Sequence, residues 1–148
     1  WSNTEVELVH DGVSYNRSAK IAAIADMPLM KQHLRVCYQP IETGLNCGNC
    51  RKCLWTMLVL ESIGCLESVA ALPHTIDPEA LRLYLPTDKH QQDRFQESIR
   101  RLEERGANPE LQRLLHELLR EGEKKADNSN SRYRQWFEKW FPKNPKMS

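Results

Sequence analysis

The stretch Cys47-Gly48-Asn49-Cys50-Arg51-Lys52-Cys53 holds three cysteines at intervals of three residues, and Cys37 lies upstream of them. Zn²⁺ prefers four thiolate ligands in a tetrahedral arrangement, and a Cys-x-x-Cys turn lets two sulfurs reach one ion. Gly48 and Asn49 are residue types that tolerate the left-handed backbone found in such turns. The sequence therefore predicts a metal centre made by these four cysteines.

Zinc is the expected ion, and an iron-sulfur cluster is the alternative, because similar cysteine spacings also hold clusters. Four protein thiolates leave no open position for water or substrate, so the expected role of the site is structural. Arg51 and Lys52 lie between the ligands. They can offset the negative charge of four thiolates around one dication or, equally, reach a phosphate.

Length and composition indicate a soluble globular chain. Its 148 residues are 40% hydrophobic and 28% charged, which suits one main folded unit. The 21 Lys and Arg nearly balance the 20 Asp and Glu, so nucleic acid is not an expected partner. There is no apolar run of the roughly 20 residues that cross a bilayer and no signal-peptide pattern, so no membrane is expected either. With the cysteines crowded into one segment, we expect a cytoplasmic location.

The expected fold class is mainly α with a short β element. Partial alternation of polar and apolar residues predicts a strand over residues 5–10, and a second short strand is expected over residues 34–38. Residues 19–26 should form a helix with Ser14 or Asn16 as its cap. We expect Pro28 to end that helix.

Beyond the cysteines the chain should be helical. A helix that is apolar on most sides should run through Trp55 to Gly64 in the centre of the core. Asp77 with Pro78 predicts another helix start. Two further helices should cover residues 88–105 and 109–125 as a hairpin. The expected parts of the chain are residues 1–72 with the metal centre, a helical extension over 73–126, and residues 127–148, with a flexible joint at 127–131 before an aromatic helix.

Residues 34–38, Leu-Arg-Val-Cys-Tyr, and 46–53, Asn-Cys-Gly-Asn-Cys-Arg-Lys-Cys, resemble the C-terminal zinc knuckle of the 7-cyano-7-deazaguanine synthase-like enzymes. These enzymes belong to the ATP pyrophosphatase, or PP-loop, superfamily. Residues 5–26 are similar to the last strand and helix of the family's nucleotide domain, and the resemblance extends to about residue 65. It identifies the chain as a divergent relative, matching the C-terminal region only.

The resemblance implies that the chain is the C-terminal part of an α/β, Rossmann-like nucleotide-binding protein. Such an enzyme converts ATP to AMP and pyrophosphate, with Mg²⁺, and adenylates a carboxylate or amide oxygen that a nitrogen nucleophile then attacks. The superfamily's Ser-Gly-Gly-x-Asp-Ser signature is not in this chain, so the catalytic loop is expected upstream. Arg17, Lys20 and Arg51 are the candidate nucleotide or substrate contacts, against the alternative that Arg17 and Lys20 lie on a solvated helix face.

A second function class remains open. The chain could be a zinc-stabilised helical module that binds a protein or RNA without catalysis. The aromatic residues between Tyr133 and Phe141, with basic residues around them, predict a packing face for a parent domain, a protein partner or a second copy of the chain. Stacking on nucleobases is the alternative for this segment. Cys65 is expected to be a small buried apolar residue.

Overall fold

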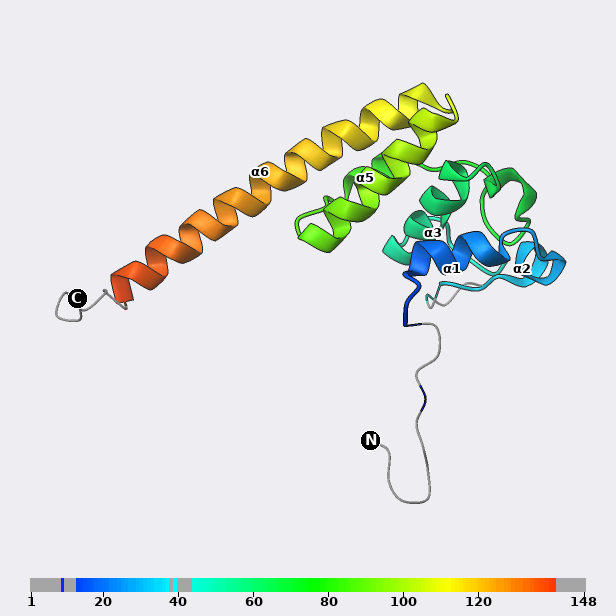
Figure 1. Cartoon of the computed structure of the whole chain (residues 1–148), viewed down its shortest axis with the longest axis horizontal. Coiled ribbons are helices and arrows are strands. Elements are labelled where there is room, and N and C mark those ends of the chain that lie inside the picture. The colour runs from blue at the N-terminus through cyan, green and yellow to red at the C-terminus, as the bar shows by residue number, and fades with distance from the viewer. Residues whose placement is uncertain (1–8, 10–12, 38, 40–43, 141–148) are drawn as a thin grey trace, which may run out of the picture.

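The computed structural model describes residues 9, 13–37, 39 and 44–140, with side chains described as far as residue 129 and at residue 131 (Figure 1). The helices, including one short 3₁₀ turn, are α1 (Arg17–Ile24), α2 (Pro28–His33), α3 (Arg51–Ser62), η1 (Leu66–Ser68), α4 (Pro78–Arg82), α5 (Lys89–Glu104) and α6 (Pro109–Trp140).

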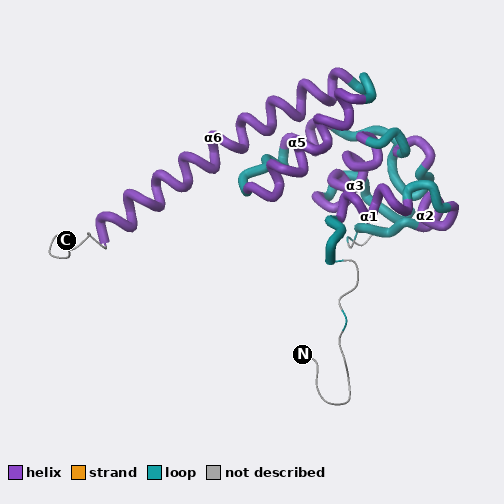
Figure 2. Tube along the Cα trace, in the orientation of Figure 1, coloured by secondary structure: helices purple, strands orange, loops and turns teal. Residues whose placement is uncertain are grey.

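No strand occurs in the described part of the chain, which confirms the mainly α class (Figure 2). The predicted strand at 34–38 is wrong for residues 34–37, which have no regular secondary structure. The strand predicted at 5–10 lies outside the described residues except for Val9, which is not in a strand. The α/β architecture implied for a parent protein stays a prediction.

Local signals set most of the helix starts. The Oδ1 of Asn16 accepts a hydrogen bond from the backbone N–H of Ala19 at 2.8 Å, so Asn16 is the cap of α1. Asp77 caps α4 by accepting from Glu79 N–H at 2.9 Å, and Pro78 follows in the first turn. Pro28 was expected to end a helix, but it begins α2, because proline fits the first turn, where its missing N–H has no intrahelical partner.

Helix α3 lies between two apolar clusters, as its composition predicts. Met57 and Leu60 pack into a cluster with α1, α2 and residues 66–72, on the side that holds the cysteines. Leu54 and Leu58 pack into a second cluster with α4, α5 and α6. All four side chains are at most 2% exposed. Side chains on different faces of α3 therefore pack into both apolar clusters of the core.

Helices α5 and α6 form an antiparallel hairpin (Figure 1). Gly106, with φ of 59°, ends α5 through hydrogen bonds from Gly106 N–H to Glu103 O and from Ala107 N–H to Leu102 O. Asn108 then caps α6 by accepting from Leu111 N–H at 3.1 Å. The residues predicted to separate the two helices thus make the turn.

Helix α6 runs antiparallel to α5 and continues well beyond the first turn of α5 (Figure 2). The flexible joint predicted at 127–131 is therefore wrong, since these residues are helical. Asn and Ser are only mildly poorer helix formers than Lys or Glu, and the residues before them already belong to a long helix. The expected aromatic helix is the last part of α6, and its side chains lie outside the described set.

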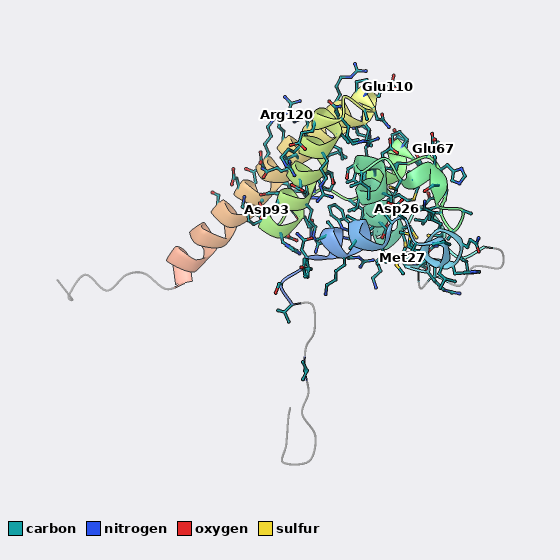
Figure 3. The ribbon with its side chains drawn as sticks, turned by 45° about the vertical axis from the view of Figure 1, so that its right-hand side comes forward. Asp26, Met27, Glu67, Asp93, Glu110 and Arg120 are labelled. Carbon is teal, nitrogen blue, oxygen red and sulfur yellow. The ribbon has the colours of Figure 1, made fainter. Side chains whose placement is uncertain are left out.

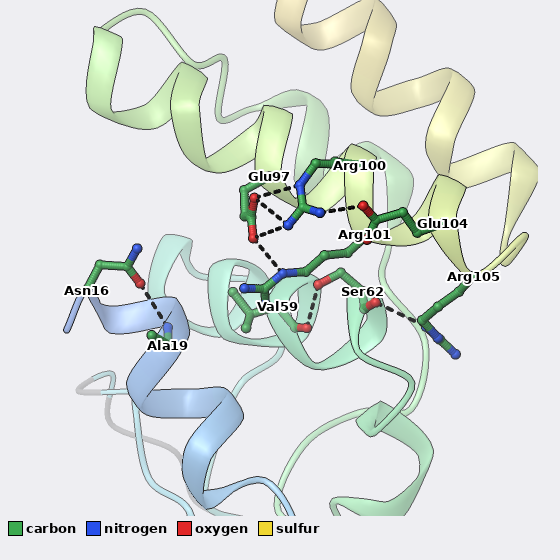
Figure 4. A network of polar contacts seen from close by, with 9 residues as sticks. All are labelled: Asn16, Ala19, Val59, Ser62, Glu97, Arg100, Arg101, Glu104 and Arg105. Carbon is green, nitrogen blue, oxygen red and sulfur yellow. Dashed lines mark hydrogen bonds and ion pairs between the residues drawn. The ribbon is translucent and has the colours of Figure 1, made fainter.

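Polar contacts fasten α5 to α3 (Figure 4). The guanidinium of Arg105 donates to the carbonyl oxygens of Glu61 at 2.8 Å and Ser62 at 3.2 Å. These carbonyls end α3, where a positive charge also opposes the negative end of the helix dipole. On α5, Glu97 accepts from both Arg100 and Arg101.

Exposed side chains are scattered over the outer surface (Figure 3), including Asp26, Met27, Glu67, Asp93, Glu110 and Arg120.

Candidate metal centre

The four predicted cysteines come together in space. Their Sγ atoms all lie within 4.8 Å of one another, and no other group of this kind occurs among the described residues. The Sγ of Cys37 is 3.5 Å from that of Cys47 and 3.8 Å from that of Cys50. The Sγ of Cys53 is 3.9 Å from that of Cys47 and 3.4 Å from that of Cys50. All four are free thiols.

These separations fit a single tetrahedral ion. Four sulfurs that each lie about 2.3 Å from a central Zn²⁺ are about 3.8 Å apart in a regular tetrahedron. The four Sγ–Sγ distances given above, 3.4 to 3.9 Å, bracket that value, and the other two pairs of sulfurs lie within 4.8 Å. A disulfide needs sulfurs only about 2 Å apart, and a cluster of several irons would hold the thiolates farther apart than one ion does. The arrangement therefore has the size of a mononuclear site.

The turn that carries Cys47 and Cys50 depends on a glycine. Gly48 has φ of 77°, and a Cβ placed on it would lie 2.6 Å from Cγ of Pro73. Both the backbone conformation and the close approach of Pro73 therefore favour glycine at this position. The turn is closed by a hydrogen bond from the Cys50 N–H to the Cys47 Sγ, at 3.3 Å.

Helix α3 supplies the fourth cysteine of the cluster. It begins directly after Cys50, its N-cap residue, so Cys53 lies in the first helical turn and is directed back to the other sulfurs. Cys53 is fully buried and Cys37 is 4% exposed, whereas Cys47 and Cys50 are half-buried. The metal centre therefore lies at the edge of the first apolar cluster, with two of its sulfurs inside the core.

Asn46 holds three segments of chain around the centre. Its side-chain nitrogen donates to the carbonyl oxygens of Leu34 at 2.7 Å and Ala71 at 2.6 Å. Its Oδ1 accepts from the backbone N–H of Val36 at 2.9 Å and of Cys37 at 3.1 Å. Every hydrogen-bonding position of the amide is used. These bonds also explain why residues 34–37 are not a strand, because their backbone groups pair with a side chain.

The pKa values of two of the cysteine thiols, Cys37 and Cys53, are shifted in opposite directions. The backbone N–H groups of Cys47 and Gln39 donate to Cys37 and lower the pKa of its thiol to about 6, although burial opposes this. Burial raises the pKa of the Cys53 thiol, and its hydrogen bond with Cys50 raises it further. Four thiolates this close repel one another strongly, and a bound dication would remove that repulsion.

Of the three residues predicted to contact a nucleotide or substrate, the structure brings two together in one cavity. Arg17 and Arg51 line one cavity beside the metal centre, with Lys52, whereas Lys20 is exposed and is not one of the residues that line it. Cys65 lies apart from the four ligands and is half-buried.

Sequence reasoning missed two kinds of residue. The role of Asn46 rests on contacts with residues up to 25 positions away, which no local pattern reveals. Arg94 lines the same cavity as Arg17 and Arg51, although it belongs to a helix in the second half of the chain. In the sequence, Arg94 is one of several charged residues of α5, and nothing in its position distinguishes it from an arginine on the protein surface.

None of the described helices is both long and apolar enough to span a membrane. Comparison with known proteins gives no family: no protein-family model matches the chain, and no significant match was found among curated proteins or solved structures.

Proposed function

We propose that Cys37, Cys47, Cys50 and Cys53 bind one Zn²⁺ as thiolates and that this ion has a structural role. The single observation that carries the proposal is the clustering of the four Sγ atoms, all within 4.8 Å of one another and 3.4 to 3.9 Å apart in four pairs, which suits tetrahedral coordination of one ion. Four protein ligands complete the coordination of zinc, so no position remains for a water nucleophile.

The ion would join parts of the chain that are distant in sequence. Cys37 belongs to the irregular segment after α2, Cys47 and Cys50 form the turn, and Cys53 belongs to α3. Apparent binding free energies of structural zinc sites are about 10 kcal/mol or more, which is comparable with the whole stability of a small domain. We therefore expect α1, α2 and the turn to lose their packing on α3 when the ion is removed.

The test is elemental analysis of the purified chain, together with thermal unfolding in the presence and absence of a chelator. One zinc per chain is expected, with a large fall in Tm after chelation. Cys50→Ser should lose the ion, whereas Cys65→Ser, which removes the thiol outside the centre, should keep it. Binding of one iron in place of zinc would overturn the assignment of the metal, and a chain without bound metal would overturn the site.

We also propose, from the resemblance of residues 34–38 and 46–53, that the centre is part of a 7-cyano-7-deazaguanine synthase-like, ATP-dependent synthetase. The upstream coding sequence tests this: a glycine-rich pyrophosphate loop after a strand would support an enzyme that uses ATP and Mg²⁺. Its absence would count against the synthetase and leave the zinc centre as the scaffold of a non-catalytic module. This outcome does not affect the metal proposal, which rests on the four sulfurs.

A further inference from the structure

A cavity of about 330 Å³ opens beside the metal centre. It lies where the first residues of α1 and α3 meet α4, α5 and the segment that joins them, and its volume falls in the range of roughly 300 to 1,000 Å³ that is usual for small-molecule sites. The residues that line it are mostly basic or apolar: Arg17, Arg51, Lys52, Leu54, Trp55, Leu81, Tyr84, Gln91, Arg94 and Phe95.

Three arginines from three helices line this cavity. Arg17 begins α1, Arg51 begins α3, and Arg94 lies on α5. Arg17 and Arg51 are exposed, and Arg94 is half-buried. Within the described part of the chain, none of the three takes part in a salt bridge, although most of the other charged residues of α5 do. These three arginines therefore bring positive charge to the cavity that carboxylates of the described residues do not neutralise in salt bridges.

Arg94 is the most constrained of the three. Its guanidinium carbon lies 5.2 Å from the centroid of the Trp55 ring, and one of its nitrogens contacts the imidazole of His90. Burial lowers the pKa of Arg94, and the charges of Arg17 and Arg51 lower it further, whereas Asp88 opposes the shift. The positive charges of Arg17, Arg51 and Arg94 are therefore near one another, and Arg94 is partly shielded from water. An anion bound among the three guanidinium groups would relieve their repulsion.

The remaining walls are apolar and aromatic. Trp55 and Phe95 are stacked with ring centroids 6.1 Å apart, and Tyr84, Leu54 and Leu81 complete this part of the lining. Trp55 also has a buried indole N–H without a hydrogen-bond partner among the described residues. Guanidinium groups match the oxygens of a phosphate, and aromatic side chains favour contact with a planar ring.

We propose that this cavity binds a small phosphate monoester that carries a planar ring, with Arg17, Arg51 and Arg94 around the phosphate and Trp55 and Tyr84 beside the ring. The site is separate from the four sulfurs, and its ligand does not depend on which metal they bind. A compact ligand is favoured over a nucleic acid chain because the three arginines face one cavity of small-molecule size, while the whole chain has a net charge of only +1.

The test is isothermal titration of the metal-loaded full chain with adenosine 5′-monophosphate as the probe. Arg94→Gln and Arg17→Gln should each raise the Kd about tenfold or more, because hydrogen bonds to charged groups are strong when partly buried. Arg113→Gln is the matched control: it removes the same charge from an exposed position of α6 that does not line the cavity, and it should leave the Kd unchanged. The far-ultraviolet circular dichroism and Tm of each variant establish that it is folded.

Three further probes separate the parts of the proposal. Adenosine and inorganic phosphate should each bind much more weakly than the monophosphate, because each lacks one of the two recognised groups. Adenosine that binds as tightly would overturn the role of the arginines, and phosphate that binds as tightly would overturn the role of the aromatic wall. A single-stranded oligonucleotide that binds more tightly than the monophosphate would overturn the small-molecule assignment, as would equal affinities of wild type, Arg94→Gln and Arg17→Gln.

Discussion

The side-chain nitrogen of Asn46 donates a hydrogen bond to the carbonyl oxygen of Ala71 at 2.6 Å, across 25 residues of sequence. Ala71 follows η1, and Asn46 immediately precedes the first cysteine of the turn. The contact therefore joins the cysteine turn to the segment that follows η1, which belongs to the first apolar cluster. Because the same nitrogen also donates to Leu34, one amide links three stretches of backbone.

Asn46→Asp should lower the free energy of unfolding by about 2 to 3 kcal/mol at pH 7, because the carboxylate cannot donate to Leu34 or Ala71. The two bonds accepted by the Oδ1 can remain. Asn49→Asp is the control, since Asn49 is exposed in the same turn and the chemical change is identical. Urea unfolding of the metal-loaded chain measures both. Equal losses in the two variants would show that added charge, and not the lost donor, is responsible.

Gly48→Ala should destabilise the chain more than Gly44→Ala. Both glycines have positive φ, 77° and 85°, so alanine at either position costs about 1 to 2 kcal/mol of backbone strain. At Gly48 the new methyl would also lie 2.6 Å from Cγ of Pro73, whereas nothing lies within 4 Å at Gly44. The difference between the two free energies of unfolding isolates the contact with Pro73. A difference near zero would mean that Pro73 moves aside without cost.

Gly122→Ala should destabilise the chain, although alanine ordinarily favours a helix over glycine by about 1 kcal/mol. A Cβ at position 122 would contact the carbonyl of Pro86, with the carbonyl carbon 2.9 Å away. Asn128→Ala provides the control, because residue 128 is an exposed position of the same helix and should be neutral or stabilising. Thermal unfolding decides the sign. An increase in Tm for Gly122→Ala would show that α6 does not pass this close to Pro86 in solution.

Glu97 should contribute to the acid sensitivity of the chain. Hydrogen bonds from Arg100, and then from Arg101, hold the pKa of this carboxyl below its usual range. A carboxyl with a lowered pKa in the folded state stabilises the fold above its unfolded pKa of about 4.3, and this contribution is lost as the pH falls through the folded value. Glu97→Gln should therefore destabilise at pH 7 and have a smaller effect at pH 3.

Urea unfolding at the two pH values measures this effect as the difference between variant and wild type, with metal-free protein used at both pH values so that the metal state is the same throughout. Glu110→Gln is the control, because Glu110 is exposed and makes no ion pair among the described residues. A Glu97→Gln effect that is the same at both pH values would refute the role assigned to the ionised carboxyl.

Local chemistry predicted the cluster of four cysteines, the cap Asp77 and, as one of two candidates with Ser14, the cap Asn16, because spacing and capping act over a few residues. The strand predicted at 34–38 was wrong for residues 34–37, since the N–H groups of Val36 and Cys37 and the carbonyl of Leu34 pair with the side chain of Asn46. The joint at 127–131 was misread because propensity is a weak signal inside a long helix. Arg17, Arg51 and Arg94 come together in one cavity because three helices pack against one another. Their spacing in the sequence does not predict this.

The position of α3 between both apolar clusters has a consequence for unfolding. Because α3 contributes side chains to each cluster, loss of packing in one cluster exposes the face of α3 that belongs to it and weakens the support that the same helix gives to the other cluster. We therefore expect a single cooperative transition, in which amide hydrogen exchange in α5 slows when metal is added, although α5 supplies no ligand. Availability of the ion would then set the lifetime of the whole helical assembly through linkage, and not only that of the turn that holds it.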